Sequence, residues 1–552
     1  MTHRGAKAGE PELRQAIRID SATRSLYEKA GWWANDTLTR WLADDVSRAA
    51  DRPAAKLGDT VVSYRELVER AERFARGLHD LGVRRGDVVS VQLPNTPEFL
   101  IAYFAITRLG AVLSTVHMPY RTAEIRTLLG HNGCVAFIGY GALKDFAPAR
   151  EVLGLKGQLP ALAHVISVGE NVSGAVAFDD LLRSDRTLPA DVAADPADPF
   201  LLLFTSGTSA SPKAVPLTYQ MTLGNARLGA GEHQFRDGDS VLSVAPFTHL
   251  LGLYALHLTT RVAGTSLLLP VFTPPELASA IARHRPSVLV CAPAHLAALV
   301  AAGLLDQADL SCIRLIITAG SALSPDLASV IAARLPNGFL TNLWGMTELQ
   351  AGLYTRPGDS PEIASTTCGR AAPGAEVRIA DLDDQPVAPG EEGELQIRGA
   401  LLFRGYYNND LANRQAFTAD GWFRSGDLAV IDAAGNVRIT GRKTDVINRG
   451  GIKYNPLDVE IILGSHPKVM QVAVVAYPDP VLGQRACCFV VPAEGPPPTL
   501  DELCGHLLTH GVSKVKLPER LLLIDEMPMT PTRKIMKRRL YERLTETQEN
   551  AS

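Results

Sequence analysis

Short apolar runs of strand length alternate with helical patterns along the first part of the chain. Val61–Tyr64 leads into a repeat of apolar residues with helical spacing, Val88–Val91 forms the next apolar run, and another unit follows over residues 97–116. Alternation of this kind predicts an α/β fold, a large layered body with mostly parallel sheets. Residues 150–198 are rich in Gly, Pro and Asp, and we expect them to form surface connections.

Length and charge narrow the class of protein. With 552 residues the chain is long enough for a large domain and a smaller one, at about 150 residues per domain. Its 46% hydrophobic and 21% charged residues are ordinary for a soluble globular protein. The formal net charge of -4 gives no field that would attract nucleic acid or an anionic membrane. We therefore expect small-molecule partners and no nucleic acid.

Cysteine usage and the apolar stretches predict a cytoplasmic protein. The seven cysteines are scattered without a Cys-x-x-Cys spacing, which is typical of reduced core residues. The first ten residues lack the apolar segment of a secretory signal. Residues 287–305 are strongly apolar but contain Pro293 and His295, so a strand followed by a helix is favoured over a membrane span, which needs about 20 apolar residues.

A hydroxyl-rich turn follows the apolar run Pro199–Phe204. Gly207 allows positive φ, so that backbone N–H groups of the turn can converge on an anion, and Lys213 adds a mobile positive charge. These features predict a phosphate-binding loop formed by Thr205, Ser206, Gly207, Thr208, Ser209 and Lys213. A solvated Ser/Thr turn is the alternative. The sequence contains neither Gly-x4-Gly-Lys-Ser/Thr nor a Gly-x-Gly-x-x-Gly that opens a helix, which excludes the common NTPase loop and leaves a Rossmann dinucleotide site unsupported.

A second candidate segment spans residues 342–348 and combines groups that suit a nucleotide. The Trp344 ring can stack on a purine, the Thr347 hydroxyl can bind an α-phosphate, and Glu348 offers the hard oxygen that Mg²⁺ prefers. The alternative is a turn with a core tryptophan and a solvated glutamate.

In order along the chain, these segments resemble the motifs of the adenylate-forming superfamily, which contains acyl-CoA synthetases, peptide-synthetase adenylation domains and luciferases. The carriers of the resemblance are Thr-Ser-Gly-Thr with Pro-Lys from residue 205, Trp-Gly-Met-Thr-Glu from residue 344 and Ser-Gly-Asp from residue 425. Trp344 stands where the family usually has tyrosine, and Ser425 where it has threonine. The resemblance covers nearly the whole chain.

The resemblance implies an ATP- and AMP-binding set. Asp427 would accept hydrogen bonds from the vicinal ribose hydroxyls, and Arg442 matches the family arginine that also reaches the ribose. The implied nucleotide-binding residues are Thr205, Ser206, Gly207, Thr208, Ser209, Lys213, Gly320, Ser321, Ala322, Asn342, Trp344, Gly345, Asp427 and Arg442.

The same resemblance implies the catalytic residues and the acid pocket. Lys534 corresponds to the catalytic lysine, with Arg533 in place of the usual glycine before it, and it would act with Thr347 and with Glu348 as the Mg²⁺ ligand. The implied pocket residues are Phe247, His249, Gly252, Gly345 and Met346. The segment around His249 offers no carboxylate for a substrate amine, which counts against an amino-acid substrate.

The expected domains are an N-terminal domain over residues 1–441, a hinge over 442–445 and a small, mobile α+β C-terminal domain over 446–552. Thr444 stands where the family hinge has aspartate or lysine, so the residue about which the two domains rotate is not identified by the resemblance. Gly450 and Gly451 match the loop that faces the thiol substrate in the family.

The implied function is an acid-thiol ligase that uses MgATP to form an acyl-AMP and then a thioester. Coenzyme A is the expected thiol, and the expected substrate is a medium-chain, alicyclic or aromatic acid. One alternative is an aryl-acid adenylase that loads a separate carrier protein. Another is a nucleotide-binding pseudo-enzyme, because Ala210 and Ala214 replace glycines usual in the phosphate loop. A monomer and a homodimer both remain open.

Overall fold

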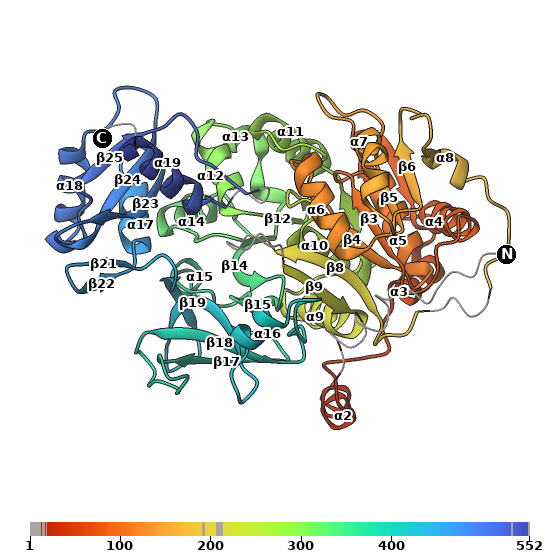
Figure 1. The fold of residues 1–552 in the computed structure, drawn as a ribbon, viewed down its shortest axis with the longest axis horizontal. Coiled ribbons are helices and arrows are strands. Elements are labelled where there is room, and N and C mark those ends of the chain that lie inside the picture. The colour runs from red at the N-terminus through yellow and green to blue at the C-terminus, as the bar shows by residue number, and fades with distance from the viewer. Residues whose placement is uncertain are drawn as a thin grey trace.

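The computed structural model describes Leu13, Ile17 and residues 19–189, 194–205, 213–530 and 534–549. Figure 1 shows a large body built from the elements up to β20, with a smaller C-terminal domain of α17–α19 and β21–β25 at one end. Within the body, two large sheets and one four-stranded sheet form separate layers.

The first large sheet has seven strands in the order β7-β6-β5-β3-β4-β8-β9. Its strands pair in parallel except for the antiparallel pair of β8 and β9. The strands are β3 (Val88–Gln92), β4 (Val112–Thr115), β5 (Ala136–Tyr140), β6 (His164–Val168), β7 (Val176–Ala177), β8 (Pro199–Thr205) and β9 (Lys213–Thr218).

Both faces of this sheet are buried, which is usual for parallel strands because crossover helices cover both sides. Alternate residues face opposite ways: Val88 and Val112 pack with helices α6 (Thr122–Asn132) and α7 (Pro148–Leu155), whereas Val89 and Leu113 belong to the central core. That core also contains α4 (Tyr64–Asp80), α5 (Pro97–Arg108) and α8 (Phe178–Leu181). Helix α5 is buried on nearly every face, as its continuous apolar sequence requires.

The second large sheet has nine strands in the order β16-β15-β14-β13-β12-β10-β11-β1-β2, parallel from β1 to β14 and antiparallel at both edges. The strands are β1 (Pro53–Leu57), β2 (Thr60–Ser63), β10 (Ser240–Ser243), β11 (Thr265–Leu267), β12 (Val288–Cys291), β13 (Leu315–Ala319), β14 (Phe339–Met346), β15 (Gln350–Tyr354) and β16 (Arg370–Ala371). Their covering helices are α3 (Leu38–Ala49), α9 (Tyr219–Glu232), α10 (Leu250–Arg261), α11 (Pro274–His284), α12 (Pro293–Ala301), α13 (Leu305–Ala308), α14 (Pro325–Ala332) and α15 (Pro361–Thr366). One face shares the central core with the seven-stranded sheet, so the two sheets and their helices form successive layers.

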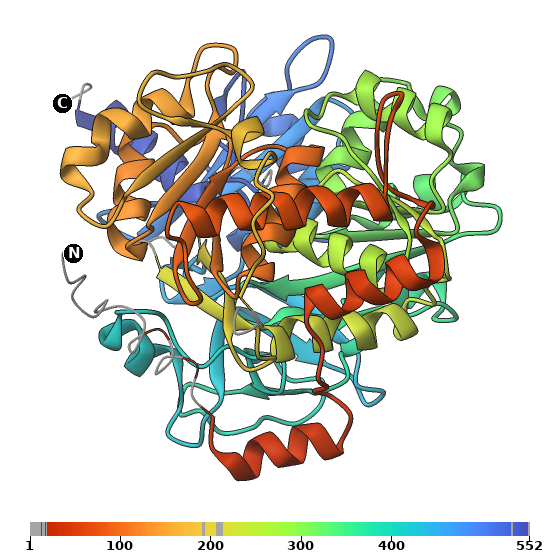
Figure 2. The same cartoon turned by 90° about the vertical axis from the view of Figure 1, so that its right-hand side faces the viewer.

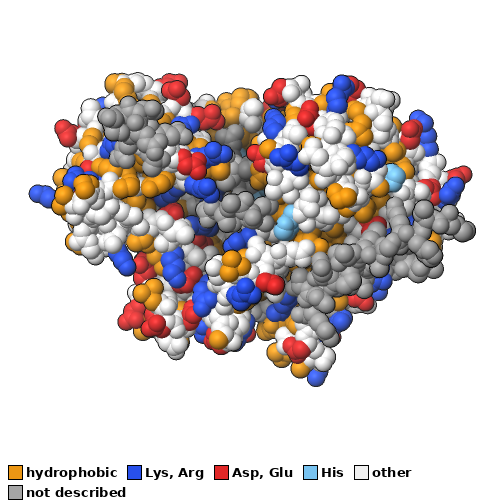
Figure 3. Space-filling model, viewed as in Figure 1, with side chains coloured by type: hydrophobic (Ala, Val, Ile, Leu, Met, Phe, Trp, Pro, Cys, Tyr) orange, Lys and Arg blue, Asp and Glu red, His pale blue; other side chains and the backbone are white. Residues whose placement is uncertain are grey.

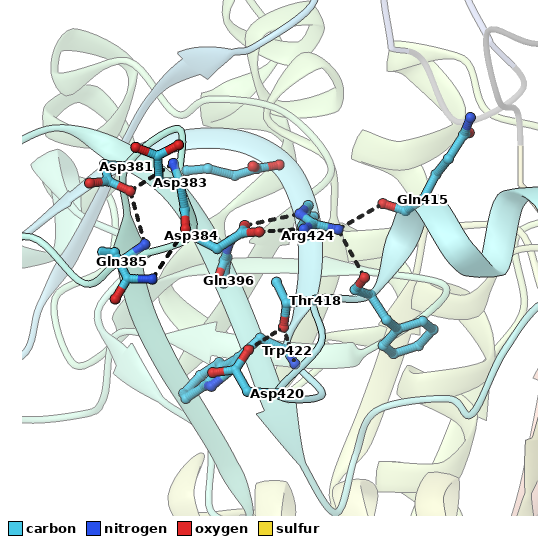
Figure 4. Close-up of polar contacts among 12 residues, drawn as sticks. Asp381, Asp383, Asp384, Gln385, Gln396, Gln415, Thr418, Asp420, Trp422 and Arg424 are labelled. Carbon is cyan, nitrogen blue, oxygen red and sulfur yellow. Dashed lines mark hydrogen bonds and ion pairs between the residues drawn. The ribbon is translucent and has the colours of Figure 1, made fainter.

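A third, antiparallel sheet joins β17 (Ala375–Ala380), β18 (Gly393–Gly399), β19 (Phe423–Ile431) and β20 (Val437–Arg442), with α16 (Asp410–Ala416) beside it. Helix α2 (Ser21–Lys29) lies against this layer in Figure 2. Figure 4 shows how polar contacts hold its loops: Arg424 pairs with Asp384 and donates to the Phe417 carbonyl at 2.9 Å, and Gln396 donates to Asp384 at 2.6 Å. These contacts fix the start of β19, which carries Asp427 at its middle.

The C-terminal domain is a small α+β unit. Its strands are β21 (Ile447–Arg449), β22 (Ile452–Tyr454), β23 (Val469–Asp479), β24 (Gly483–Pro492) and β25 (Arg520–Leu523). Helices α17 (Leu457–Gly464) and α18 (Leu500–Thr509) pack on one face and α19 (Lys537–Glu549) on the other. Cys487 and Cys488 are buried on opposite faces, in agreement with the core positions expected for cysteines.

The expected fold class is confirmed. The expectation for residues 150–198 is wrong in part, because the stretch contains β6, whose last four residues are buried, and the short elements β7 and α8. A five-residue strand between Pro- and Gly-rich segments is too short to show a period. Through the part of the chain that the structure describes, we find no helix with the length and apolarity to cross a bilayer.

Candidate active site

The predicted phosphate loop joins two paired strands. Thr205 at the end of β8 pairs with Lys213 at the start of β9, so the loop between them begins and ends at one point on the sheet. The Lys213 ammonium lies 4.9 Å from the centre of the Tyr406 ring. Ser206, Gly207, Thr208 and Ser209 lie outside the described residues, so their predicted contacts with phosphate stay predictions.

The carboxyl ends of β13 and β14 lie side by side, because Thr318 pairs with Asn342. Gly320, Ser321 and Ala322 follow β13 directly and are exposed. The side-chain amide of Asn342 donates through Nδ2 to the Thr367 carbonyl at 2.8 Å, which fixes the orientation of the Asn342 side chain. In a mostly parallel sheet this edge is where ligands bind.

The turn between β14 and β15 depends on Gly345. A Cβ at this position would lie 2.0 Å from the Gln350 carbonyl oxygen, so no other residue permits the two strands to approach so closely. Thr347 and Glu348 lie in this turn; Thr347 is partly exposed and Glu348 is buried. Met346 ends β14 and is partly buried.

The segment that ends in Tyr406 holds Glu348 by two hydrogen bonds. The Tyr406 hydroxyl donates to Glu348 Oε1 at 2.8 Å, and the Phe403 amide donates to the Glu348 carbonyl at 2.8 Å. Burial raises the pKa of Glu348, which the Tyr406 hydrogen bond and the charges of Lys213 and Arg442 oppose.

Glu348 suits Mg²⁺ as a single carboxylate ligand. Mg²⁺ usually keeps several waters and binds one or two carboxylates together with substrate phosphates. Within the described part of the chain, no group of three or more His, Cys, Asp or Glu side chains that could hold a metal occurs.

Asp427 is bound through both carboxylate oxygens. Trp344 Nε1 donates to Oδ2 at 2.8 Å, and Arg442 Nε lies 2.9 Å from Oδ1, with Arg442 directly opposite Asp427 on β20. Only 8% of the Asp427 side chain is exposed, against 43% for Arg442. The three nucleotide-binding candidates therefore form one connected set, and the hydrogen bond fixes the edge of the Trp344 ring.

Lys534 reaches this set from the C-terminal domain. Its amide donates to Thr530 Oγ1 at 3.0 Å, and the Thr530 amide donates to the Lys534 carbonyl at 2.7 Å. Burial lowers the pKa of Lys534 to about 8, as does the Arg442 charge, whereas Asp427 raises it. Figure 3 shows the surface hollowed between the C-terminal domain and the body. The charges of Arg442 and Asp427 on the body thus act on a lysine that belongs to the C-terminal domain.

His249 stands at the N-terminus of α10. Its Nδ1 accepts the Leu251 amide at 3.2 Å, which places the ring proton on Nε2. Burial and the nearby Lys534 charge lower the pKa of His249 to about 4, and its ring centre lies 6.1 Å from that of His117. Burial and His249 lower the pKa of His117 to about 3. The two imidazoles are therefore neutral near pH 7.

Phe247 and Gly252 fix the backbone around His249. Phe247 is buried, and its amide donates to Asn95 Oδ1 at 2.7 Å. A Cβ on Gly252 would lie 2.2 Å from the Pro246 carbonyl oxygen, so Gly252 lets α10 begin tightly against the preceding turn.

Gly450 and Gly451 lie apart from these residues, in the exposed turn between β21 and β22. The Gly450 amide donates to the Leu482 carbonyl at 2.8 Å. Their role as the thiol-facing loop stays a prediction.

Two residues of this site were missed from the sequence. Tyr406 contacts Glu348 from a distant segment, and nothing in Gly405-Tyr406-Tyr407 indicates that contact. His117 lies two residues after the end of β4, and the rule that ligands bind at the carboxyl ends of parallel strands could have found it.

Comparisons with known proteins show the family of the chain. Residues 42–407 match the AMP-binding enzyme family, and residues 458–534 match the AMP-binding enzyme C-terminal domain. The chain is 36% identical over 532 residues to "Salicyl-AMP ligase / salicyl-S-ArCP synthetase" of Mycobacterium tuberculosis, covering 94% of this chain and 92% of the relative. It is 28% identical to "Medium-chain fatty-acid--CoA ligase" of Escherichia coli, covering 96% and 94%. Among solved structures it is similar to anthranilate CoA ligase AuaEII in complex with anthranoyl-AMP, with a TM-score of 0.86, 26% identity and coverage of 94% and 99%.

Proposed function

Because the chain belongs to the AMP-binding enzymes of the adenylate-forming superfamily, we propose that it activates an aryl carboxylic acid with ATP and transfers the acyl group to the thiol of a carrier protein. The chain is an ATP-dependent adenylate-forming ligase of carboxylic acids. The aryl class of the acid and the identity of the thiol are the proposed part.

The observation that carries the proposal is the 36% identity, over nearly the full length of both chains, to a protein named as a ligase of salicyl-AMP and a synthetase of salicyl-S-ArCP. Coenzyme A was the thiol expected from the sequence, and this relative gives more support to the alternative, a separate carrier protein. The pocket candidates are consistent with an aromatic acid, since Phe247 and two neutral imidazoles, His249 and His117, lie in this region.

In the first step a carboxylate oxygen of the acid attacks the α-phosphorus of MgATP. The new bond is O–Pα, the bond to the bridging oxygen of the β-phosphate breaks, and pyrophosphate leaves. Glu348 would hold Mg²⁺, which would neutralise negative charge on the phosphates. We propose that the Lys534 ammonium, which is lost as the pH rises through about 8, stabilises negative charge on the carboxylate and phosphate oxygens.

Asp427, with Arg442 and Trp344 fixed around it, would hold the ribose and the adenine so that the α-phosphorus is presented in line. In the second step the thiol sulfur attacks the acyl carbon, the bond from that carbon to the AMP oxygen breaks, AMP leaves and the thiol proton passes to solvent. We propose that rotation within residues 442–445 withdraws Lys534 and brings the Gly450–Gly451 turn to the thiol.

A screen of pyrophosphate release tests the proposal. Benzoate, salicylate, dihydroxybenzoate, anthranilate, octanoate and amino acids are each supplied with ATP, and then with either coenzyme A or a purified carrier protein bearing a phosphopantetheine thiol. We expect release with aryl acids and thioester formation only with the carrier. Thioester formation with coenzyme A alone would favour the second candidate, a CoA ligase, which is supported by the Escherichia coli relative and the anthranilate CoA ligase structure. Bound ATP without release for any acid would overturn both and favour a nucleotide-binding pseudo-enzyme.

A further inference from the structure

Lys537 joins two helices of the C-terminal domain to the hinge segment. It is the first residue of α19, and its ammonium lies 2.8 Å from Glu460 Oε1 on α17 and 3.5 Å from Asp445 Oδ2, directly after Thr444. Glu460 Oε1 also accepts the Val474 amide at 2.6 Å. The exposed fractions of the Lys537, Glu460 and Asp445 side chains are 23%, 13% and 26%, so these ion pairs are partly shielded from water.

The other side of the hinge is fixed to the body. Lys443 Nζ lies 3.0 Å from Glu394 Oε2, whose side chain is 6% exposed, and the Lys443 amide donates to the Gly426 carbonyl at 2.9 Å. Lys443 is thus bound to the body and Asp445 to the C-terminal domain, with Thr444 between them. A rotation at Thr444 can leave both sets of ion pairs intact.

Lys537 follows the catalytic segment directly. The segment is closed by the bridge between Met529 and Ile535 and by the Met536 amide, which donates to the Pro528 carbonyl at 2.8 Å. Lys537 and Lys534 are therefore linked by a short stretch of chain with its own hydrogen bonds. A shift in the position of Lys537 should also displace Lys534.

We propose that Lys537 is a positioning residue that fixes the catalytic segment to the hinge residue Asp445, so that Lys534 reaches the nucleotide site only when the hinge adopts the arrangement seen here. This inference rests on the proposed function, because it assumes that Lys534 acts in adenylation. The competing explanation is structural: an ion pair between Glu460 and Lys537 that only holds the C-terminal domain together, since removing one partner of a buried pair is strongly destabilising.

Asp445→Asn separates the two explanations. It removes the charge with which the hinge residue pairs with Lys537, while leaving the pair of Lys537 and Glu460 in place. We expect acid-dependent exchange of pyrophosphate into ATP to fall about tenfold at pH 6.5, and more for Lys537→Met, because displacement of a catalytic group by about 1 Å can reduce rates about 100-fold. The second half-reaction, conversion of supplied acyl-AMP to thioester, does not need Lys534 in the proposed function. Its rate should therefore stay within about twofold of the wild-type rate.

The choice of pH 6.5 keeps Lys534 protonated in every variant, so that an electrostatic effect of Asp445 on the lysine does not enter. The double variant Lys537→Met with Glu460→Gln removes both charges, so that Glu460 is not left as an unpaired carboxylate. It should lose pyrophosphate exchange while keeping the conversion of acyl-AMP to thioester. Lys537→Arg, which keeps the charge, should recover part of the exchange activity.

Lys516→Met is the matched control. It breaks the ion pair of Lys516 with Asp458, 3.4 Å apart on the outer side of α17, and should leave both half-reactions unchanged. Equal loss of both half-reactions in Asp445→Asn, or no loss in either, would overturn the positioning role while leaving the proposed function intact. A wild-type protein that shows no exchange with any acid would overturn the proposed function and this inference with it.

Discussion

The body and the C-terminal domain hold their shares of the site in different ways. In the body, Asp427 is bound on both oxygens by Trp344 and Arg442, and Glu348 is buried beneath Tyr406. The C-terminal domain contributes Lys534 on a short segment that the ion pairs of Lys537 tie to its own domain. In the proposed function, the nucleotide-binding candidates are therefore preorganised, whereas the charge proposed for the first step sits on the part of the molecule that we propose to move.

Removing the movable charge gives the largest expected effect. Lys534→Ala should lower acid-dependent pyrophosphate exchange by about 10²- to 10³-fold, the range found when one preorganised charge-stabilising donor is lost. ATP affinity should change little, because the body still holds the nucleotide. Both half-reactions are measured, with the exposed Lys514→Ala as control. An equal loss in the conversion of supplied acyl-AMP to thioester would contradict the division of roles between the two parts.

Removing a fixed charge in the body should instead act on binding. Asp427→Asn keeps the size of the side chain but loses the charged partner of Arg442 and one strong acceptor for the ribose. Hydrogen bonds to charged groups contribute about 1.5–3 kcal/mol, which corresponds to about 10- to 150-fold in affinity. Calorimetric titration with ATP measures the effect. Unchanged ATP affinity would remove Asp427 from the nucleotide site.

The pH dependence should separate the two half-reactions. The pKa of Lys534 is lowered from 10.5 to about 8, so about half of the ammonium is lost at that pH and the rest is lost as the pH rises further. Adenylation should therefore fall about tenfold per pH unit above pH 8. Thioester formation should rise over the same range, because a free thiol has a pKa near 8.5 and its thiolate is the nucleophile. Burial is the main cause of this lowered pKa; the charges of Arg442 and Lys537 lower it further, and those of Asp427 and Asp445 raise it. Adenylation that stays constant to pH 10 would show that the charge of Lys534 is not used.

Much of the fold could be predicted from the sequence because its signals are local. The run Val88–Val91 became the parallel strand β3, and residues 287–305 formed the strand β12 followed by the helix α12, since apolar runs that end at turn residues favour strands. Strand β6 was missed because it carries no period of its own and is recognised only by its neighbours in the sheet.

Residues of the site could be predicted only where they belong to a recognised sequence motif. Trp344, Asp427, Arg442 and Lys534 were predicted by resemblance, and the structure brings them together, although their roles stay predictions. The contacts of Tyr406 with Glu348, like those of Lys537 with Asp445 and Glu460, join segments far apart in the sequence, and no spacing rule reports such contacts.

The substitution with the smallest expected effect tests how rigidly Trp344, Asp427 and Arg442 are held together. Trp344→Phe keeps an aromatic face for the adenine but removes the Nε1–H donor to Asp427 Oδ2. Trp344 is only partly buried, so water can replace the donor, and we expect a loss of about 1 kcal/mol, a several-fold weaker ATP affinity, with kcat nearly unchanged. Trp422→Phe, in the outer sheet against Arg378 and Arg398, is the control for the loss of a tryptophan. A loss as large as that of Asp427→Asn would mean that the hydrogen bond, and not the pair with Arg442, is what holds Asp427 in its binding orientation.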